Sequence, residues 1–207
     1  MKSIRKPFTT IDLLRHGATN TSGLLSAHAD EALSKQGFAD LKNATEHGNW
    51  DVIITSPMQR CHAFAKWLAV QNNCLIEVEK QIKEMDFGRW TGMPIAEIWQ
   101  NEPEQLKQLW QQPDDFTAPD GESIQDFRKR VLKAMTNIMQ KHENKVILIV
   151  THTGVIRAIL ANALDISMKS ALKFSIEYAS LSRIHCYPDK EYSLQLHGLY
   201  GNDHTHL

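Results

Sequence analysis

Two histidines in this sequence each follow a short, mostly apolar run that ends in one polar residue. His16 stands after Ile11–Arg15, and His152 stands after Val146–Thr151. If both runs are neighbouring parallel strands, their imidazoles meet at the carboxyl edge of the sheet, where open α/β sheets bind ligands. This arrangement suits a nucleophilic histidine for phosphoryl transfer, and it is also compatible with a zinc site.

Arginine, rather than Asp, Glu or Cys, accompanies the first of these histidines. Arg15 precedes His16, and Arg60 falls in the first turn of a predicted helix that follows another strand. A helix start attracts anions through its free N–H groups, and the guanidinium fork suits phosphate. Both cations would also oppose protonation of His16 and leave its lone pair free to attack phosphorus. The neighbourhood therefore favours a phosphate over a metal ion.

Glu84 is the candidate acid. It precedes Phe87–Trp90, a run with two aromatic residues and a glycine that differs from a solvated surface. A carboxylic acid that aromatic side chains partly enclose, and that faces a phosphate, can keep its proton and pass it to a leaving oxygen. The turn Gly121–Ser123 is expected mainly to cap the helix that follows it.

The elements that must position these groups follow from the apolar periodicity. Strands are expected over residues 8–14, 50–55, 74–78, 145–150, 181–187 and 192–196. Helices are expected over 35–46, 58–71, 94–112 with a break at Pro103, 124–142 and 155–164. This alternation predicts an α/β fold, a three-layer α/β/α sandwich with a mostly parallel central sheet. We expect one domain over 1–207, with a lid-like insertion over about 93–120 and a flexible tail over 198–207.

Composition limits the class of protein. The 207 residues are 42% hydrophobic and 23% charged, which suits one ordinary globular domain. A net charge of −1 provides no overall field for nucleic acid or an anionic membrane, and three scattered cysteines form no metal-binding pair. Neither a secretory signal nor a membrane-length apolar run stands out, so we expect a soluble, cytoplasmic protein. The sequence leaves its oligomeric state open.

Taken together, the motifs resemble those of the histidine phosphatase (phosphoglycerate mutase-like) superfamily. They stand in the family's order and span nearly the whole chain: Leu14–Gly17, Ser56–Arg60, Glu84–Gly92, Gly121–Ser123 with Phe127 and Arg130, and Val150–Gly154. The resemblance implies that His16 is transiently phosphorylated and that Glu84 donates the proton. It implies that the phosphoryl group is bound by Arg15, Arg60 and His152. No metal or other cofactor is implied.

A closer resemblance concerns the substrate. Residues 23–29, and the compact region between the acid and the turn at 121–123, are similar to small bacterial phosphatases. Those that act on alpha-ribazole 5′-phosphate in cobalamin nucleotide-loop biosynthesis are the most similar. A small phosphorylated metabolite, rather than nucleic acid or a membrane, is the partner that this resemblance implies.

Three further residues are candidates for substrate binding. In the family an asparagine stands six positions after the nucleophile, where this chain has Ser22, with Asn20 nearby. Either residue is a candidate for that role. Thr153, next to the second histidine, is the third candidate.

Other functions fit the same motifs. A phosphoglycerate mutase or a broad sugar or nucleotide phosphatase would share them, and a phospho-ligand binding module could keep the scaffold without catalysis. A metal hydrolase would lose its activity to a chelator. Ile95–Trp110 is expected to pack as lid or core, although Trp90, Trp99 or Trp110 could stack on a ring of the substrate.

Overall fold

The computed structural model describes residues 8–21, 23–188 and 191–199. Its strands are β1 (Thr9–Arg15), β2 (Val52–Thr55), β3 (Leu75–Val78), β4 (Val146–Thr151), β5 (Leu181–Cys186) and β6 (Tyr192–Leu199). Its α-helices are α1 (Lys35–Thr45), α2 (Gln59–Asn72), α3 (Ile95–Asn101), α4 (Pro103–Gln111), α5 (Ile124–Lys141), α6 (Thr153–Ala163) and α7 (Met168–Ala171). Short 3-10 helices occupy Lys80–Ile82 (η1), Gly88–Trp90 (η2) and Pro113–Asp115 (η3). Within these ranges, no helix is long and apolar enough to cross a membrane.

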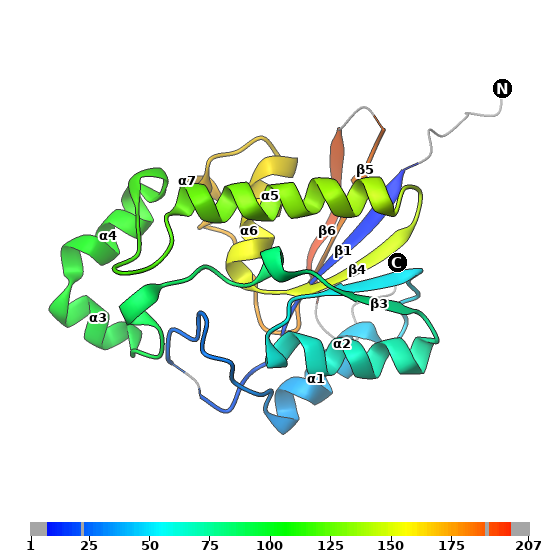
Figure 1. The fold of residues 1–207 in the computed structure, drawn as a ribbon, viewed down its shortest axis with the longest axis horizontal. Helices are drawn as coiled ribbons and strands as arrows, with labels where there is room; N and C mark the ends of the chain where they lie inside the picture. Colours follow the sequence, from blue (N-terminus) through cyan, green and yellow to red (C-terminus); the bar gives the residue numbers. More distant parts are fainter. Residues whose placement is uncertain (1–7, 22, 189–190, 200–207) are drawn as a thin grey trace.

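The strands form one sheet in the order β3-β2-β4-β1-β5-β6 (Figure 1). The first four strands run parallel, and β5 and β6 are antiparallel to their neighbours. In the register of β1 against β4, Arg15 lies opposite Thr151. The chain therefore leaves both strands at the same level, and each next residue is a histidine. The predicted α/β sandwich with a mostly parallel sheet is confirmed.

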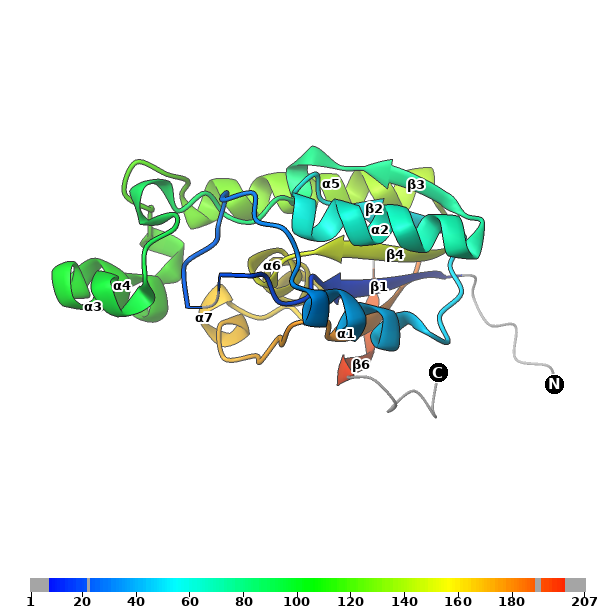
Figure 2. The same cartoon turned by 90° about the horizontal axis from the view of Figure 1, so that it is seen from below.

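Helices cover both faces of this sheet (Figures 1 and 2), because alternate strand residues point to opposite sides. Ile11 and Leu13 belong to the core that α5 and α6 close, whereas Leu14 belongs to the core under α1 and α2. All three side chains are fully buried. Packing on both faces keeps β1 in place, and with it the loop that carries His16.

Helices α3 and α4 project from one end of the molecule, away from the sheet and the helices that cover its two faces (Figures 1 and 2). Pro103 occupies the first turn of α4, where its missing N–H costs nothing, so the helical run breaks there as predicted. This α3–α4 insertion is tied back to the body by backbone hydrogen bonds. Leu25 donates its N–H to the carbonyl of Met93 at 2.9 Å and accepts from the N–H of Gly92 at 2.8 Å.

The carboxyl-terminal part differs from the prediction in two ways. Strand β6 continues to Leu199, where it still pairs with Leu181 of β5, so it runs three residues beyond its predicted end at 196 and into the segment expected as a tail. The remainder of that tail, 200–207, lies outside the described residues. Helix α7, which Ser167 caps by accepting from the N–H of Ser170, was not predicted.

Candidate active site

His16 and His152 lie side by side at the carboxyl edge of the sheet. Their ring centroids are 5.3 Å apart with the planes at 64°. The main chain fixes this spacing, because the N–H of His16 donates to the carbonyl of Thr151 at 2.9 Å. Both rings are buried, with exposed fractions of 6% and 0%. The structure thus brings together the two histidines that the strand ends predict.

The tautomer of His16 follows from its hydrogen bond. Nδ1 lies 2.8 Å from the carbonyl oxygen of Gly17, which can only accept, so Nδ1 carries the proton. Burial, followed by the positive charges of Arg60 and Arg15, lowers the pKa of His16 from 6.5 to about 3. The ring is therefore neutral near pH 7, with the lone pair of Nε2 available. The two arginines act in the expected direction, but burial is the larger cause.

Arg15 faces the segment that precedes β5. Its Nη1 donates to the carbonyl of Ile176 at 2.7 Å, and its guanidinium carbon lies 3.8 Å from the ring centroid of Tyr178. The Tyr178 ring is also 5.6 Å from the ring of His16, centroid to centroid. The Nε of Arg15 is buried and has no hydrogen-bond partner among the described residues. Tyr178 was missed because no periodicity marks its segment.

Arg60 lies in the first turn of α2 and is only 1% exposed. Its two terminal nitrogens donate to the carbonyls of Ala27 and Ala29 at 2.6 and 2.7 Å. Its buried Nε has no partner within the described ranges. A buried cation with an unused donor at the start of a helix is typical of an anion-binding site.

His152 is held from the neighbouring strand. Its Nε2 is 2.8 Å from the hydroxyl oxygen of Ser56, the residue after β2. Burial, and then the charges of His16 and Arg60, lowers the pKa of His152 well below its usual value. The Sγ of Cys61 lies 3.7 Å from Nε2, and burial raises the pKa of that thiol, so it stays protonated. Ser56 directly follows a predicted strand, and this position is the feature of the sequence that could have indicated its contact with the site.

Glu84 enters the site from the segment between β3 and the insertion. One carboxyl oxygen accepts the N–H of Gly154 at 3.0 Å, and the other accepts that of Met85 at 2.9 Å. A Cβ at position 154 would lie 2.3 Å from a Glu84 oxygen, so any larger residue there would displace the carboxyl group. Phe87 and Trp90, the aromatic residues predicted to enclose this carboxyl group, line a pocket in the insertion. The hydrogen bonds to the carboxyl group come from backbone N–H groups.

The remaining candidates lie at different places. Thr153 is half-buried at the start of α6, and Asn20 is exposed in the loop after β1. Ser22 lies outside the described residues. Arg157, four residues beyond Thr153 on the same helix, was not singled out from the sequence. Burial lowers its pKa while the nearby charge of Glu84 opposes that shift, so this third arginine borders the site.

The charge pattern decides what the site can hold. Across the residues that the structure describes, no three His, Cys, Asp or Glu side chains gather in a group that could hold a metal ion. The donors around His16 are instead guanidinium N–H groups and a second imidazole, beside one carboxylate. Such a set binds a tetrahedral oxyanion and stabilises charge that develops on it.

This chain is similar in sequence to several known proteins. A bifunctional protein of Mycobacterium tuberculosis is 30% identical over 194 residues, 91% of this chain but only 53% of its own length. This chain therefore spans about half of that relative. A phosphoserine phosphatase of Hydrogenobacter thermophilus is 28% identical over 84% of each chain. An adenosylcobalamin/alpha-ribazole phosphatase of Escherichia coli is 24% identical over 83% of this chain and 87% of its own.

Solved structures show the same fold. The alpha-ribazole phosphatase of Shigella flexneri superposes with a TM-score of 0.80 at 23% identity, covering 92% of this chain and 96% of that one. The model of one family matches residues 11–198, from the first strand into the last. By that match, and with its paired strand-end histidines, the chain belongs to the histidine phosphatase superfamily (branch 1).

Proposed function

We propose that this protein is a metal-independent phosphomonoesterase that works through a phosphohistidine at Nε2 of His16. One observation carries the proposal: a neutral, buried imidazole with a free Nε2 lone pair lies beside a second histidine and within the electrostatic reach of two arginines. That geometry suits nucleophilic attack on a phosphoryl group whose charge the arginines hold.

In the first step the phosphoryl oxygens of the substrate lie against Arg15, Arg60 and His152. The lone pair of Nε2 attacks phosphorus, the bond between phosphorus and the ester oxygen breaks, and Glu84 gives its proton to that oxygen. The alcohol leaves and the phosphoryl group stays on His16. Buried, preorganised donors favour this step because they need no rearrangement as charge develops.

In the second step water replaces the alcohol. The Glu84 carboxylate takes a proton from the water, the oxygen attacks phosphorus, and the bond to Nε2 breaks. Inorganic phosphate leaves and the carboxylic acid is restored for the next cycle. One residue thus serves as acid and then as base, as the reversal of the first step requires.

The cofactor question has a direct test. The enzyme is assayed for phosphate release from p-nitrophenyl phosphate before and after dialysis against a strong metal chelator. The proposal expects unchanged kcat/KM, because the charge is held by guanidinium groups. Loss of activity that added divalent metal restores would contradict it and favour a metal hydrolase.

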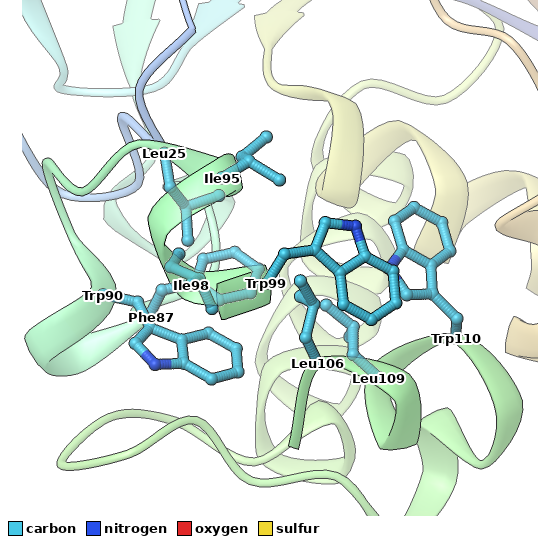
Figure 3. Close-up of a pocket in the computed structure, with 9 residues that line it drawn as sticks. All are labelled: Leu25, Phe87, Trp90, Ile95, Ile98, Trp99, Leu106, Leu109 and Trp110. Atoms are coloured by element: carbon cyan, nitrogen blue, oxygen red, sulfur yellow. The ribbon is translucent and has the colours of Figure 1, made fainter. Parts of the chain in front are cut away.

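A pocket of about 370 Å³ in the α3–α4 insertion bears on the substrate. Nine apolar or aromatic side chains line it: Leu25, Phe87, Trp90, Ile95, Ile98, Trp99, Leu106, Leu109 and Trp110. Figure 3 shows Leu25 and Ile95 on one side of Trp99, with Leu106 and Leu109 on the other. Leu25 belongs to the loop after His16, and Phe87 stands three residues after Glu84. We therefore assign this pocket to the organic part of the substrate, with the insertion as a lid.

Alpha-ribazole 5′-phosphate is the substrate that we propose. Its leaving group carries a flat bicyclic ring, which suits tryptophan-lined walls, and the Escherichia coli relative is named for this activity. Phosphoserine and 3-phosphoglycerate carry small charged leaving groups that such a pocket does not favour. A kcat/KM advantage of about 100-fold for alpha-ribazole phosphate would correspond to about 2.7 kcal/mol of discrimination. Equal or better turnover of phosphoserine would refute this assignment and leave the phosphatase proposal intact.

A further inference from the structure

Arg130, on α5, uses every N–H of its guanidinium group. Nε and Nη2 donate hydrogen bonds to the two carboxylate oxygens of Glu122, at 2.7 and 2.9 Å. Nη1 donates to the carbonyls of Gln81 and Lys83, and Nη2 also donates to the carbonyl of Glu84 at 2.9 Å. The Arg130 and Glu122 side chains are only 18% and 16% exposed. A guanidinium carries five donors, and here all five have acceptors.

Three of the five acceptors are main-chain carbonyls of one segment, residues 81–84, which carries the candidate acid. Glu122 adds two contacts of its own: its carboxylate accepts the N–H of Asp86 at 3.3 Å, and its N–H donates to the carbonyl of Asp86 at 2.9 Å. His28 also donates to the carbonyl of Glu84, at 2.9 Å. The main chain of Glu84 is thus fixed from α5, while its carboxyl group is fixed by Gly154 of α6.

We propose that Arg130, with Glu122, is a positioning residue for Glu84. It holds the main chain of that residue where the carboxyl group reaches the leaving oxygen. The inference rests on the proposed function, since it gives Arg130 a role only through proton transfer. Lysine cannot replace it, because a single ammonium group lacks the planar fork that reaches two carboxylate oxygens and three carbonyls at once. A misplacement of about 1 Å at a catalytic group can cost about 10²-fold in rate.

Leaving-group chemistry separates this role from general support of the fold. p-Nitrophenolate is a stable anion and departs without a proton, whereas an alkoxide from glycerol phosphate needs one. A misplaced acid therefore slows the alkyl ester selectively. Damage to the phosphate pocket, or a smaller folded fraction, lowers kcat/KM for both esters by the same factor.

The experiment measures kcat/KM for both esters in Arg130→Lys and Glu122→Gln. With glycerol phosphate we expect a loss of about 10- to 10²-fold in each variant, against less than about threefold with p-nitrophenyl phosphate. Arg128→Lys is the matched control, because Arg128 is on the same helix but pairs with Asp114, at 3.3 Å, at the surface. Its ratio of the two kcat/KM values should equal that of the wild type.

Glu84→Gln calibrates the series. Its kcat/KM should fall mainly for the alkyl ester. Adding Arg130→Lys to it should not lower the ratio of the two kcat/KM values further. One contrary result is that Arg130→Lys and Glu122→Gln lose activity equally on both esters while Glu84→Gln loses it mainly on the alkyl ester. That result would overturn the positioning role alone. Equal losses in Glu84→Gln itself would instead contradict the proton donor of the proposed function. If Arg130→Lys does not fold, Glu122→Gln gives the same readout.

Discussion

The carboxyl edge of the sheet and the α3–α4 insertion differ in what they bury. At the sheet edge, His16, Arg60 and His152 are almost completely buried, and strand register and specific hydrogen bonds hold them. In the insertion, Trp99 and Trp110 remain 46% and 47% exposed and border an apolar pocket. One region keeps charge out of water, and the other leaves aromatic surface in contact with it.

We infer from this difference that the sheet edge carries out the chemical step and that the insertion determines which substrates bind. In the proposed function, buried polar groups with fixed partners act on the phosphoryl group, which is common to all substrates of the class. Exposed apolar surface contributes to the free energy of binding only when a particular organic group covers it. Changes at the sheet edge should therefore affect every phosphomonoester, and changes in the insertion should affect only some.

His16→Asn should lower kcat/KM by at least about 10⁴-fold, because no nucleophile remains to accept the phosphoryl group. The loss should be the same for glycerol phosphate and 1-naphthyl phosphate. Phosphate release measured with both esters checks this. Substantial residual turnover of either ester would place the attacking group elsewhere.

Arg15→Gln should lower kcat/KM by about 10²- to 10³-fold, the usual cost of removing one donor from a preorganised anion site. The glutamine also loses the stacking on Tyr178. Both esters should again lose equally, because the phosphoryl group is their common part. Arg128→Gln is the control, with wild-type kinetics expected. A loss confined to the naphthyl ester would show that Arg15 contacts the organic group instead.

Lowering the pH should lower the free energy of unfolding, because His16 is buried as a neutral imidazole. Unfolded, His16 takes up a proton near its ordinary pKa of 6.5, but the folded state resists protonation down to about pH 3. The unfolded state therefore binds more protons in that window, and the unfolding free energy falls as pH drops. At pH 5 the loss from His16 should be about 2 kcal/mol, or about 30-fold in the folding equilibrium.

Urea unfolding at pH 7 and pH 5 measures this loss. His16→Asn should lose about 2 kcal/mol less than the wild type over the same interval. Trp99→Ala should keep the wild-type fall, because α3 and α4 contain no histidine. An identical fall in His16→Asn and the wild type would contradict a neutral, buried His16.

Trp99→Ala should have the smallest effect on activity, and a selective one. Loss of ring contacts worth about 0.5–1.5 kcal/mol should raise KM for 1-naphthyl phosphate about two- to tenfold. Glycerol phosphate, which has no ring, should be turned over as before. Equal changes with both esters would mean that the insertion supports the reaction itself, and the two regions would not be separable.

Local patterns in the sequence predict much of this molecule. His16 and His152 are found because each follows an apolar strand, and parallel pairing then brings strand ends together. Arg60 is found because Pro57 and a preceding strand indicate the start of a helix. The order of strands and helices follows from the same periodicities, which need no knowledge of distant contacts.

Contacts between distant segments could not be predicted in this way. Tyr178 meets Arg15 across 163 positions in a segment without periodicity. Arg157 is a single cation on an otherwise uncharged helix, and nothing local shows that it borders the site. Glu122 belongs to a predicted capping turn, and its pairing with Arg130 is known only from the fold. Burial, the main cause of the lowered His16 pKa, is also a property of the packed structure.

The most direct test is to trap the phosphorylated enzyme. The protein is mixed with a fast phosphomonoester, quenched with alkali in the first turnover, and analysed by ³¹P NMR and peptide mass spectrometry. We predict one phosphoryl group per chain on Nε2 of His16, since Nδ1 is engaged by Gly17, and none in His16→Asn. Phosphate release in the wild type with no phosphohistidine, or with the label on another residue, would contradict the account.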